Sequence, residues 1–321
     1  MQGNLKYQLI LHLIVLIWGI TGILGDYIDL NTANDLYGSS EQAVISLKIV
    51  FYRTAIAALS LIIIGLFIKR KKRLTPKQIL FLLGVGVVVG IHWFAFFYSI
   101  KISTVSIAVV CMSMSTLFTS ILEPIFFKRK LALSEVIISL FILAGIIIIF
   151  GFEFTYVEGI IAGLVSALFA TIFTVLNGIF IKNIPSLAIT KWEMVGAAAF
   201  TGLGLLIFEQ YDSNFLSIGS TNWMYLGILS LVCTTMAFMV SVWVMKHVTP
   251  FTVSISVNME PIYTIIMVLI IGHVQGIQKE NMTWGFYLGS IIIIASIFSN
   301  AIIKKRNNKR KTSKENFAVA K

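Results

Sequence analysis

Residues 101–119, KISTVSIAVVCMSMSTLFT, return along the chain as residues 246–264, KHVTPFTVSISVNMEPIYT, at a constant offset of 145 residues (246 − 101). A lysine opens both stretches, a threonine closes both, and the same offset pairs Glu135 with Glu280. Apolar matches alone would be weak evidence for a repeat in an apolar chain. Several polar pairs at the same offset are stronger evidence. The sequence therefore predicts two copies of one unit.

The composition around this repeat is that of a membrane protein. Of 321 residues, 58% are hydrophobic and 12% are charged, and the mean hydropathy is +0.92. A soluble domain carries about 25% charged residues. Apolar blocks of about 20 residues, each long enough to cross the hydrocarbon core as a helix, recur along the whole chain.

The expected fold class is an all-α membrane protein with ten transmembrane helices. We expect them, within a few residues, at 7–25, 44–68, 78–98, 104–127, 133–151, 158–181, 187–208, 223–245, 250–271 and 284–303.

The connections between these helices alternate in charge. Basic clusters occupy 69–77, 128–130 and 304–311, while the connections of the other set hold only Lys101 and Lys279 as basic residues. Because basic connections stay in the cytoplasm, both termini are predicted to be cytoplasmic in a multi-pass protein of the cell (inner) membrane. The net charge of +11 then indicates anionic lipid headgroups as partners of the basic loops, and no nucleic acid.

Five spans per copy is an odd number, so the second copy enters the membrane from the opposite side. We expect a first repeat at 1–152, a second at 153–303 and a disordered basic cytoplasmic tail at 304–321. Inverted repeats build many secondary transporters, which bind their solute near the midplane. The alternative is a duplication that serves only to make a stable bundle.

Within the bundle, the GxxxG spacings Gly86–Gly90 and Gly159–Gly163 predict close helix approaches.

Glu260 is the most informative polar residue. It lies about ten residues into its span, roughly 15 Å deep, where a charge costs on the order of 2.5–3.5 kcal/mol. It should therefore face a wet cavity, and the adjacent Pro261 should kink or break the helix there. The alternative is a neutral glutamic acid bonded to a neighbouring helix. In the first repeat the equivalent positions are Ser115 and Thr116, so the two halves have diverged at this depth.

Helical spacing around Glu260 predicts one polar stripe. Steps of three and four residues join Thr252, Ser256, Glu260 and Tyr263 or Thr264 on one helical face.

Two further ionisable residues lie inside spans. Arg53 needs an anionic partner or a wet pocket, because its guanidinium stays charged. Glu193 occupies a comparable place in the seventh span, so the two could pair with each other or contact the solute. Glu123 lies near the end of the fourth span, where an ion pair with Lys128 or Arg129 is expected.

The remaining candidates for solute binding are polar and aromatic residues inside the spans, of which His92 and Trp93 lie toward the outer surface. His92 and Trp93 could line a vestibule or belong to an interfacial belt. The complete predicted set is Glu260, Arg53, Ser115, Thr119, Ser256, Tyr263, Trp18, His92, Trp93 and Glu193.

Several of these residues carry a family resemblance. Trp18-Gly19, Arg53 followed by Ala57, and the block that starts SMSTLFTSILEPIFFKRK at Ser113 and returns as VNMEPIYTIIMVLIIG make the chain similar to the drug/metabolite transporter superfamily, specifically the EamA-type ten-helix permeases. The resemblance implies two inverted five-helix repeats around a central cavity. It also implies movement of small metabolites, often amino acids, frequently outward.

The leading functional hypothesis is a secondary transporter that alternates access around a cavity lined by spans one, three, four, six, eight and nine. Glu260 is the candidate for proton coupling, and facilitated diffusion or exchange without ion coupling is the close alternative. A channel or a passive scaffold is less favoured. The sequence contains no HExxH and no GxSxG motif, so an enzyme is not expected.

The expected partners are the bilayer and a small neutral or zwitterionic solute, with Arg53 available for a carboxylate. The chain is expected to be a monomer or a homodimer. Cys111 and Cys233 lie inside apolar blocks, so neither a metal site nor another cofactor is expected.

Overall fold

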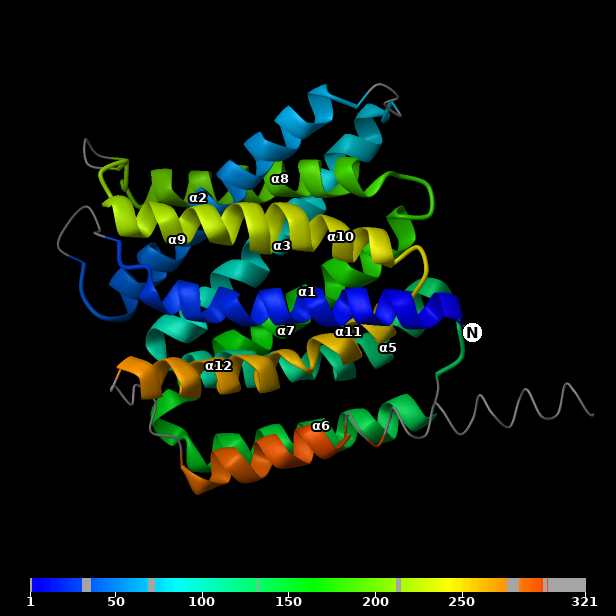
Figure 1. Ribbon diagram of the computed structural model, residues 1–321, viewed down its shortest axis with the longest axis vertical. Helices are drawn as coiled ribbons and strands as arrows, with labels where there is room; N and C mark the ends of the chain where they lie inside the picture. The colour runs from blue at the N-terminus through cyan, green and yellow to red at the C-terminus, as the bar shows by residue number, and fades with distance from the viewer. Residues whose placement is uncertain are drawn as a thin grey trace, which may run out of the picture.

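The computed structural model describes residues 2–30, 36–68, 73–131, 133–211, 215–275, 283–296 and 299. In these residues the structure is a bundle of helices (Figure 1). The predicted tail at 304–321, Lys279 and Glu280 lie outside the described residues. The helices are α1 (Gln2–Tyr27), α2 (Ser39–Leu66), α3 (Pro76–Ile102), α4 (Val105–Cys111), α5 (Ser115–Phe127), α6 (Leu133–Phe152), α7 (Val157–Phe180), α8 (Ser186–Ile207), α9 (Ser220–Ser230), α10 (Ala237–Val244), α11 (Pro250–Val257), α12 (Glu260–Gln275) and Trp284–Ser296.

Eight helical segments in the described part of the chain are long and apolar enough to cross a membrane. Three of them join shorter helices end to end: α4 with α5, α9 with α10, and α11 with α12. The remaining two predicted spans correspond to α8, which is less apolar because it carries Lys191 and Glu193, and to Trp284–Ser296. The fold is an all-helical membrane protein of two inverted five-helix repeats, as the sequence predicts.

The repeated stretches adopt the same broken-helix form. In the fourth span a 3-10 turn at Met112–Met114 separates α4 from α5, and in the ninth span a turn at Asn258 and Met259 separates α11 from α12. The offset of 145 places Met114 on Met259, so both helices break at equivalent positions. Only the second break is followed by a proline, Pro261, which cannot donate a backbone hydrogen bond.

Equivalent threonines begin the two broken helices. Thr104 Oγ1 accepts a hydrogen bond from the backbone N of Ile107 (3.2 Å), and Thr249 Oγ1 accepts one from the backbone N of Thr252 (3.2 Å). Each hydroxyl satisfies a donor that the first turn of a helix leaves unpaired. The sequence pairing of these threonines therefore reflects the same local structure in both repeats.

Glycines allow the helices around the centre to approach closely, as predicted. A Cβ at Gly86 of α3 would lie 2.9 Å from the Cα of Gly196 in α8. A Cβ at Gly163 of α7 would lie 2.7 Å from the Cβ of Cys111. Glycine is required at these contacts because any side chain would overlap the facing helix.

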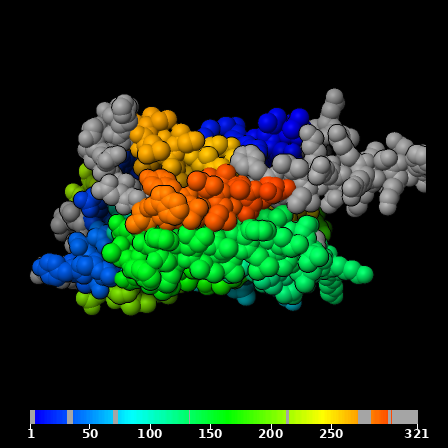
Figure 2. Space-filling model, turned by 90° about the horizontal axis from the view of Figure 1, so that it is seen from below, coloured from blue at the N-terminus to red at the C-terminus, as the bar shows by residue number. Residues whose placement is uncertain are grey.

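The helices divide into a central group and an outer pair. In Figure 1, α1 runs between α9–α10 on one side and α11–α12 on the other, while α6 and Trp284–Ser296 lie together at the edge of the bundle. Gly145 and Ile293 bring that outer pair into contact. Figure 2 shows the face that the outer pair presents. Its exposed side chains are large and apolar and include Leu140, Ile147 and Ile291, which suits a lipid-facing surface.

Candidate functional site

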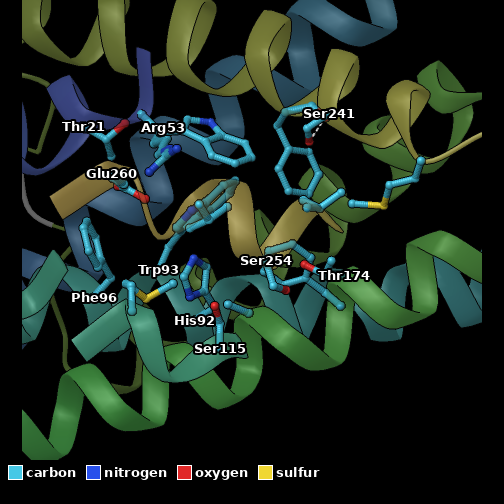
Figure 3. Close-up of a pocket in the computed structure, with 18 residues that line it drawn as sticks. Thr21, Arg53, His92, Trp93, Phe96, Ser115, Thr174, Ser241, Ser254 and Glu260 are labelled. Carbon is cyan, nitrogen blue, oxygen red and sulfur yellow. Dashed lines mark hydrogen bonds between the residues drawn. The ribbon is translucent and has the colours of Figure 1, made fainter. Parts of the chain in front are cut away.

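A cavity of about 740 Å³, counting the space open to solvent, lies among the central helices (Figure 3). Spans one, two, three, four, six, eight and nine line it, so the second span joins the six that were predicted. The lining residues are Trp18, Thr21, Arg53, His92, Trp93, Phe96, Met112, Ser115, Ala170, Phe173, Thr174, Phe238, Ser241, Met245, Val253, Ser254, Val257 and Glu260.

Arg53 is held at one end of this cavity by neutral groups. Its side chain is 1% exposed, and its Nε donates a hydrogen bond to Thr234 Oγ1 at 2.6 Å. The guanidinium carbon lies 3.9 Å from the ring centroid of Trp93, which gives a cation–π contact. The Nη1 atom has no hydrogen-bond partner among the residues that the structure describes. This arrangement leaves part of the guanidinium available to an anionic group of a solute.

Glu260 lies at the same end of the cavity, where it begins α12 directly after the helix break. Its carboxyl group makes no hydrogen bond or salt bridge to a residue that the structure describes. Glu260 and Arg53 interact electrostatically without a contact short enough for a salt bridge. Figure 3 shows both head groups beside Thr21. The hollow predicted beside Glu260 is present.

The aromatic and imidazole candidates also lie at the cavity. His92 Nδ1 lies 3.0 Å from the carbonyl oxygen of Ser166 and 2.9 Å from its hydroxyl, which fixes the ring between α3 and α7. Trp18 Nε1 donates a hydrogen bond to the carbonyl oxygen of Cys233 at 3.1 Å. Both rings therefore have a polar partner in the protein and turn apolar surface toward the cavity. Trp93 contributes the ring that stacks on Arg53.

Four predicted site residues lie outside the cavity lining. Thr119 Oγ1 bonds to Ser254 Oγ (2.8 Å), and Ser256 Oγ donates to the carbonyl of Thr252 (2.9 Å). The other two bond elsewhere: the hydroxyl of Tyr263 meets Nδ1 of His12 at 3.3 Å, and Glu193 accepts from Nδ2 of Asn177 at 3.3 Å.

The predicted polar stripe reaches the cavity only at Glu260. In α11 the residues that line the cavity are Val253, Ser254 and Val257, and Thr252 and Ser256 are not among them. Of the alternatives left open for Arg53 and Glu193, a pair between the two is not formed. Arg53 bonds to Thr234, while Glu193 is fully buried beside Asn177 in the contact of α8 with α7.

The sequence analysis missed much of the cavity wall. The missed polar groups are the hydroxyls of Thr21, Thr174, Ser241 and Ser254, and the missed rings are those of Phe96, Phe173 and Phe238. Steps of three or four residues join Phe238 and Ser241 of α10 with Met245, which directly follows that helix. Such steps recur by chance in an apolar chain rich in phenylalanine and serine, so the signal was too weak to select them.

An ion pair outside the cavity was correctly predicted. Glu123 Oε1 lies 3.0 Å from Nε of Arg129, and Glu135 Oε2 lies 2.7 Å from Nη2 of the same arginine. Although burial acts to lower it, the hydrogen bonds and charges of Glu135 and Glu123 raise the pKa of Arg129 above its ordinary value. Glu123 Oε2 also accepts a bond from the backbone N of Phe251 at 2.6 Å, which ties α5 to the start of α11.

The described residues offer no group of three or more His, Cys, Asp or Glu side chains that could hold a metal ion. The chemistry of the cavity is instead that of non-covalent binding: one cation, one carboxyl group, several hydroxyls and a wall of aromatic rings. This combination can orient a small molecule that carries charged groups at one end.

Comparisons with known proteins agree with this architecture. The EamA-like transporter family matches residues 5–151 and again residues 157–302. A solved crystal structure of a protein superimposes with a TM-score of 0.63 at 15% sequence identity, covering 94% of this chain and 98% of its own, which shows a shared fold. No curated protein sequence matches significantly. Because the family match covers nearly the whole chain in two repeats, the chain belongs to the EamA-like transporter family.

Proposed function

We propose that this membrane transporter moves a small amino-acid-like metabolite by alternating access around the cavity, in the outward direction. The observation that carries the proposal is the pair of opposite charges, Arg53 and Glu260, at one end of an otherwise aromatic and hydroxyl-lined cavity. A carboxylate of the solute would bind Arg53, and an ammonium group would lie near Glu260. The rings of Trp18 and Trp93 would contact its apolar part.

We further propose that Glu260 exchanges a proton during transport, which would couple the flux to the proton gradient. Facilitated diffusion or exchange without ion coupling is the alternative, in which Glu260 only binds the solute. We place the protein in the cell (inner) membrane with both termini in the cytoplasm, as the basic connections indicate. Repeat boundaries at 1–152 and 153–303, anionic lipid at the basic loops, and a monomer or homodimer belong to the same proposal.

The test is counterflow in proteoliposomes that contain the purified protein. Vesicles loaded with one unlabelled amino acid or nucleoside at a time receive the same compound in labelled form outside. A carrier should give saturable uptake with a transient overshoot for at least one amino acid. Uptake that rises linearly without an overshoot would indicate a channel, and no uptake of any compound in the panel would contradict the proposed solute class.

A further inference from the structure

The span formed by α9 and α10 contains a turn of π-helix, Leu231–Met236, at the depth of the cavity. Thr234 Oγ1 donates a hydrogen bond to the carbonyl oxygen of Leu229, five residues earlier, at 2.8 Å. Single π-helical turns inside α-helices are frequently found at functional sites. No motif in the sequence marks this turn.

The π-helical turn contacts three side chains of the first repeat. The carbonyl oxygen of Cys233 accepts from Trp18, the hydroxyl of Thr234 accepts from Arg53, and Thr235 Oγ1 lies 2.8 Å from Ser60 Oγ. Two of these three, Trp18 and Arg53, line the cavity. Cys233, Thr234 and Thr235 do not line it. The turn therefore supports the binding groups from behind.

Arg53 depends on this support for its orientation. The bond to Thr234 engages Nε, the face of the guanidinium rests on Trp93, and Nη1 is left without a partner. With Nε bonded to Thr234 and the guanidinium lying over the ring of Trp93, the guanidinium has little freedom to rotate. A rigid guanidinium binds a carboxylate with less loss of conformational entropy than a mobile one.

We propose that Thr234 is a positioning residue for solute binding: its hydroxyl holds the guanidinium of Arg53 so that the free Nη edge meets a carboxylate in the cavity. The inference rests on the proposed role of Arg53 in the transport function. Thr234 acts through Arg53 and has no contact of its own with the solute. Removing its hydroxyl leaves the Nε–H of Arg53 buried without an acceptor, so the guanidinium turns away from its position.

The kinetic test compares Thr234→Val with Thr234→Ser and with the matched control Thr235→Val, which loses the bond to Ser60 and leaves Arg53 untouched. The probe is the amino acid that the wild-type protein carries fastest in counterflow, with its carboxamide derivative as competitor. T234V should raise KM about ten-fold at an unchanged maximal rate, and should lose the preference for the acid over the carboxamide. T234S and T235V should behave like the wild type. Equal effects of T234V and T235V would overturn the proposal.

A second measurement does not require transport. In protein labelled with ¹⁵N at arginine Nε, the Nε–H of Arg53 should exchange slowly with water in the wild type and in T235V, and rapidly in T234V. Unchanged slow exchange in T234V would overturn the positioning role, whether or not any amino acid is carried. A lack of transport of every amino acid would separately contradict the proposed function. If T234V does not fold, Thr234→Ala with Thr235→Ala as its control replaces the pair.

Discussion

Arg53 and Glu260 are both buried ionisable side chains near the middle of their spans, where an isolated charge is costly. The hydroxyl of Thr234 and the ring of Trp93 offset part of this cost for Arg53. The cation–π contact with Trp93 contributes about 0.5–2 kcal/mol. Glu260 has no such partner among the described residues, and the cavity is its polar environment. Arg53 is therefore held in place by the protein, whereas the carboxyl group of Glu260 is the one that we propose binds a proton or a cationic group.

The proton role of Glu260 predicts a specific change in Glu260→Gln. Glutamine keeps the size and polarity of the neutral acid but cannot release a proton. In proteoliposomes with an imposed pH gradient, the wild type should accumulate solute against its concentration gradient. E260Q should only equilibrate the solute, at a rate that no longer depends on pH.

The matched control is Glu158→Gln, which neutralises an exposed carboxylate at the start of α7. This variant should keep both accumulation and pH dependence. If E260Q accumulates solute as the wild type does, Glu260 is not the proton carrier. In that case transport without ion coupling through Glu260 becomes the better account.

At the scale of elements, the helix breaks decide which side chains reach the cavity. Pro261 allowed the break before α12 to be predicted, but the equivalent turn at Met112–Met114 is not followed by a proline and was not predicted. The π-helical turn at Leu231–Met236 has no proline or glycine to indicate it. The turn carries a local bond from Thr234 to the carbonyl of Leu229 and long-range bonds from side chains of the first repeat, and neither is visible in residue spacing.

Close packing of α3 on α8 predicts opposite outcomes for two glycines of the same helix. Gly86→Ala would push a methyl group into the backbone of α8, so it should destabilise the protein by about 1–3 kcal/mol and lower the melting temperature in detergent. Gly84 has no atom within 4 Å of an added Cβ. Gly84→Ala should leave the melting temperature unchanged or raise it, because alanine favours helix by about 1 kcal/mol over glycine. Equal melting temperatures for both variants would contradict the packing described.

At the scale of the whole molecule, the two repeats differ at equivalent ends. Met245 lines the cavity where α10 ends, while Ile100, 145 residues earlier (245 − 100), is 2% exposed and packs beside Gly22. The cavity thus extends from the charged pair toward the end of the bundle where α11 begins. With the orientation proposed above, this end faces the cytoplasm, and the conformation would be one of the two that the proposed alternating access requires.

The sequence predicted the fold more fully than the site. Long apolar blocks, charge alternation and polar pairs in one register are properties of the whole chain, and they were sufficient for spans and repeats. Arg53 and Glu260 were identified because charged groups deep inside spans are rare, whereas Trp93 was named only as a residue of a vestibule or of an interfacial belt. The partners of Glu193 and the inward face of α11 depend on helix rotation and local breaks, which spacing alone cannot supply.

The central claim is that the cavity is wet and receives the solute, and alkylation of a single introduced cysteine tests it most directly. Ser241→Cys places a thiol in the cavity wall, while Ser139→Cys, in α6, places one at a fully buried position outside it. The native Cys111 and Cys233 are buried, so the wild type serves as the blank. A small charged methanethiosulfonate should label S241C, and the amino acid carried in counterflow should protect it, while S139C stays unlabelled. An unlabelled S241C, or labelling that no carried amino acid slows, would contradict the account.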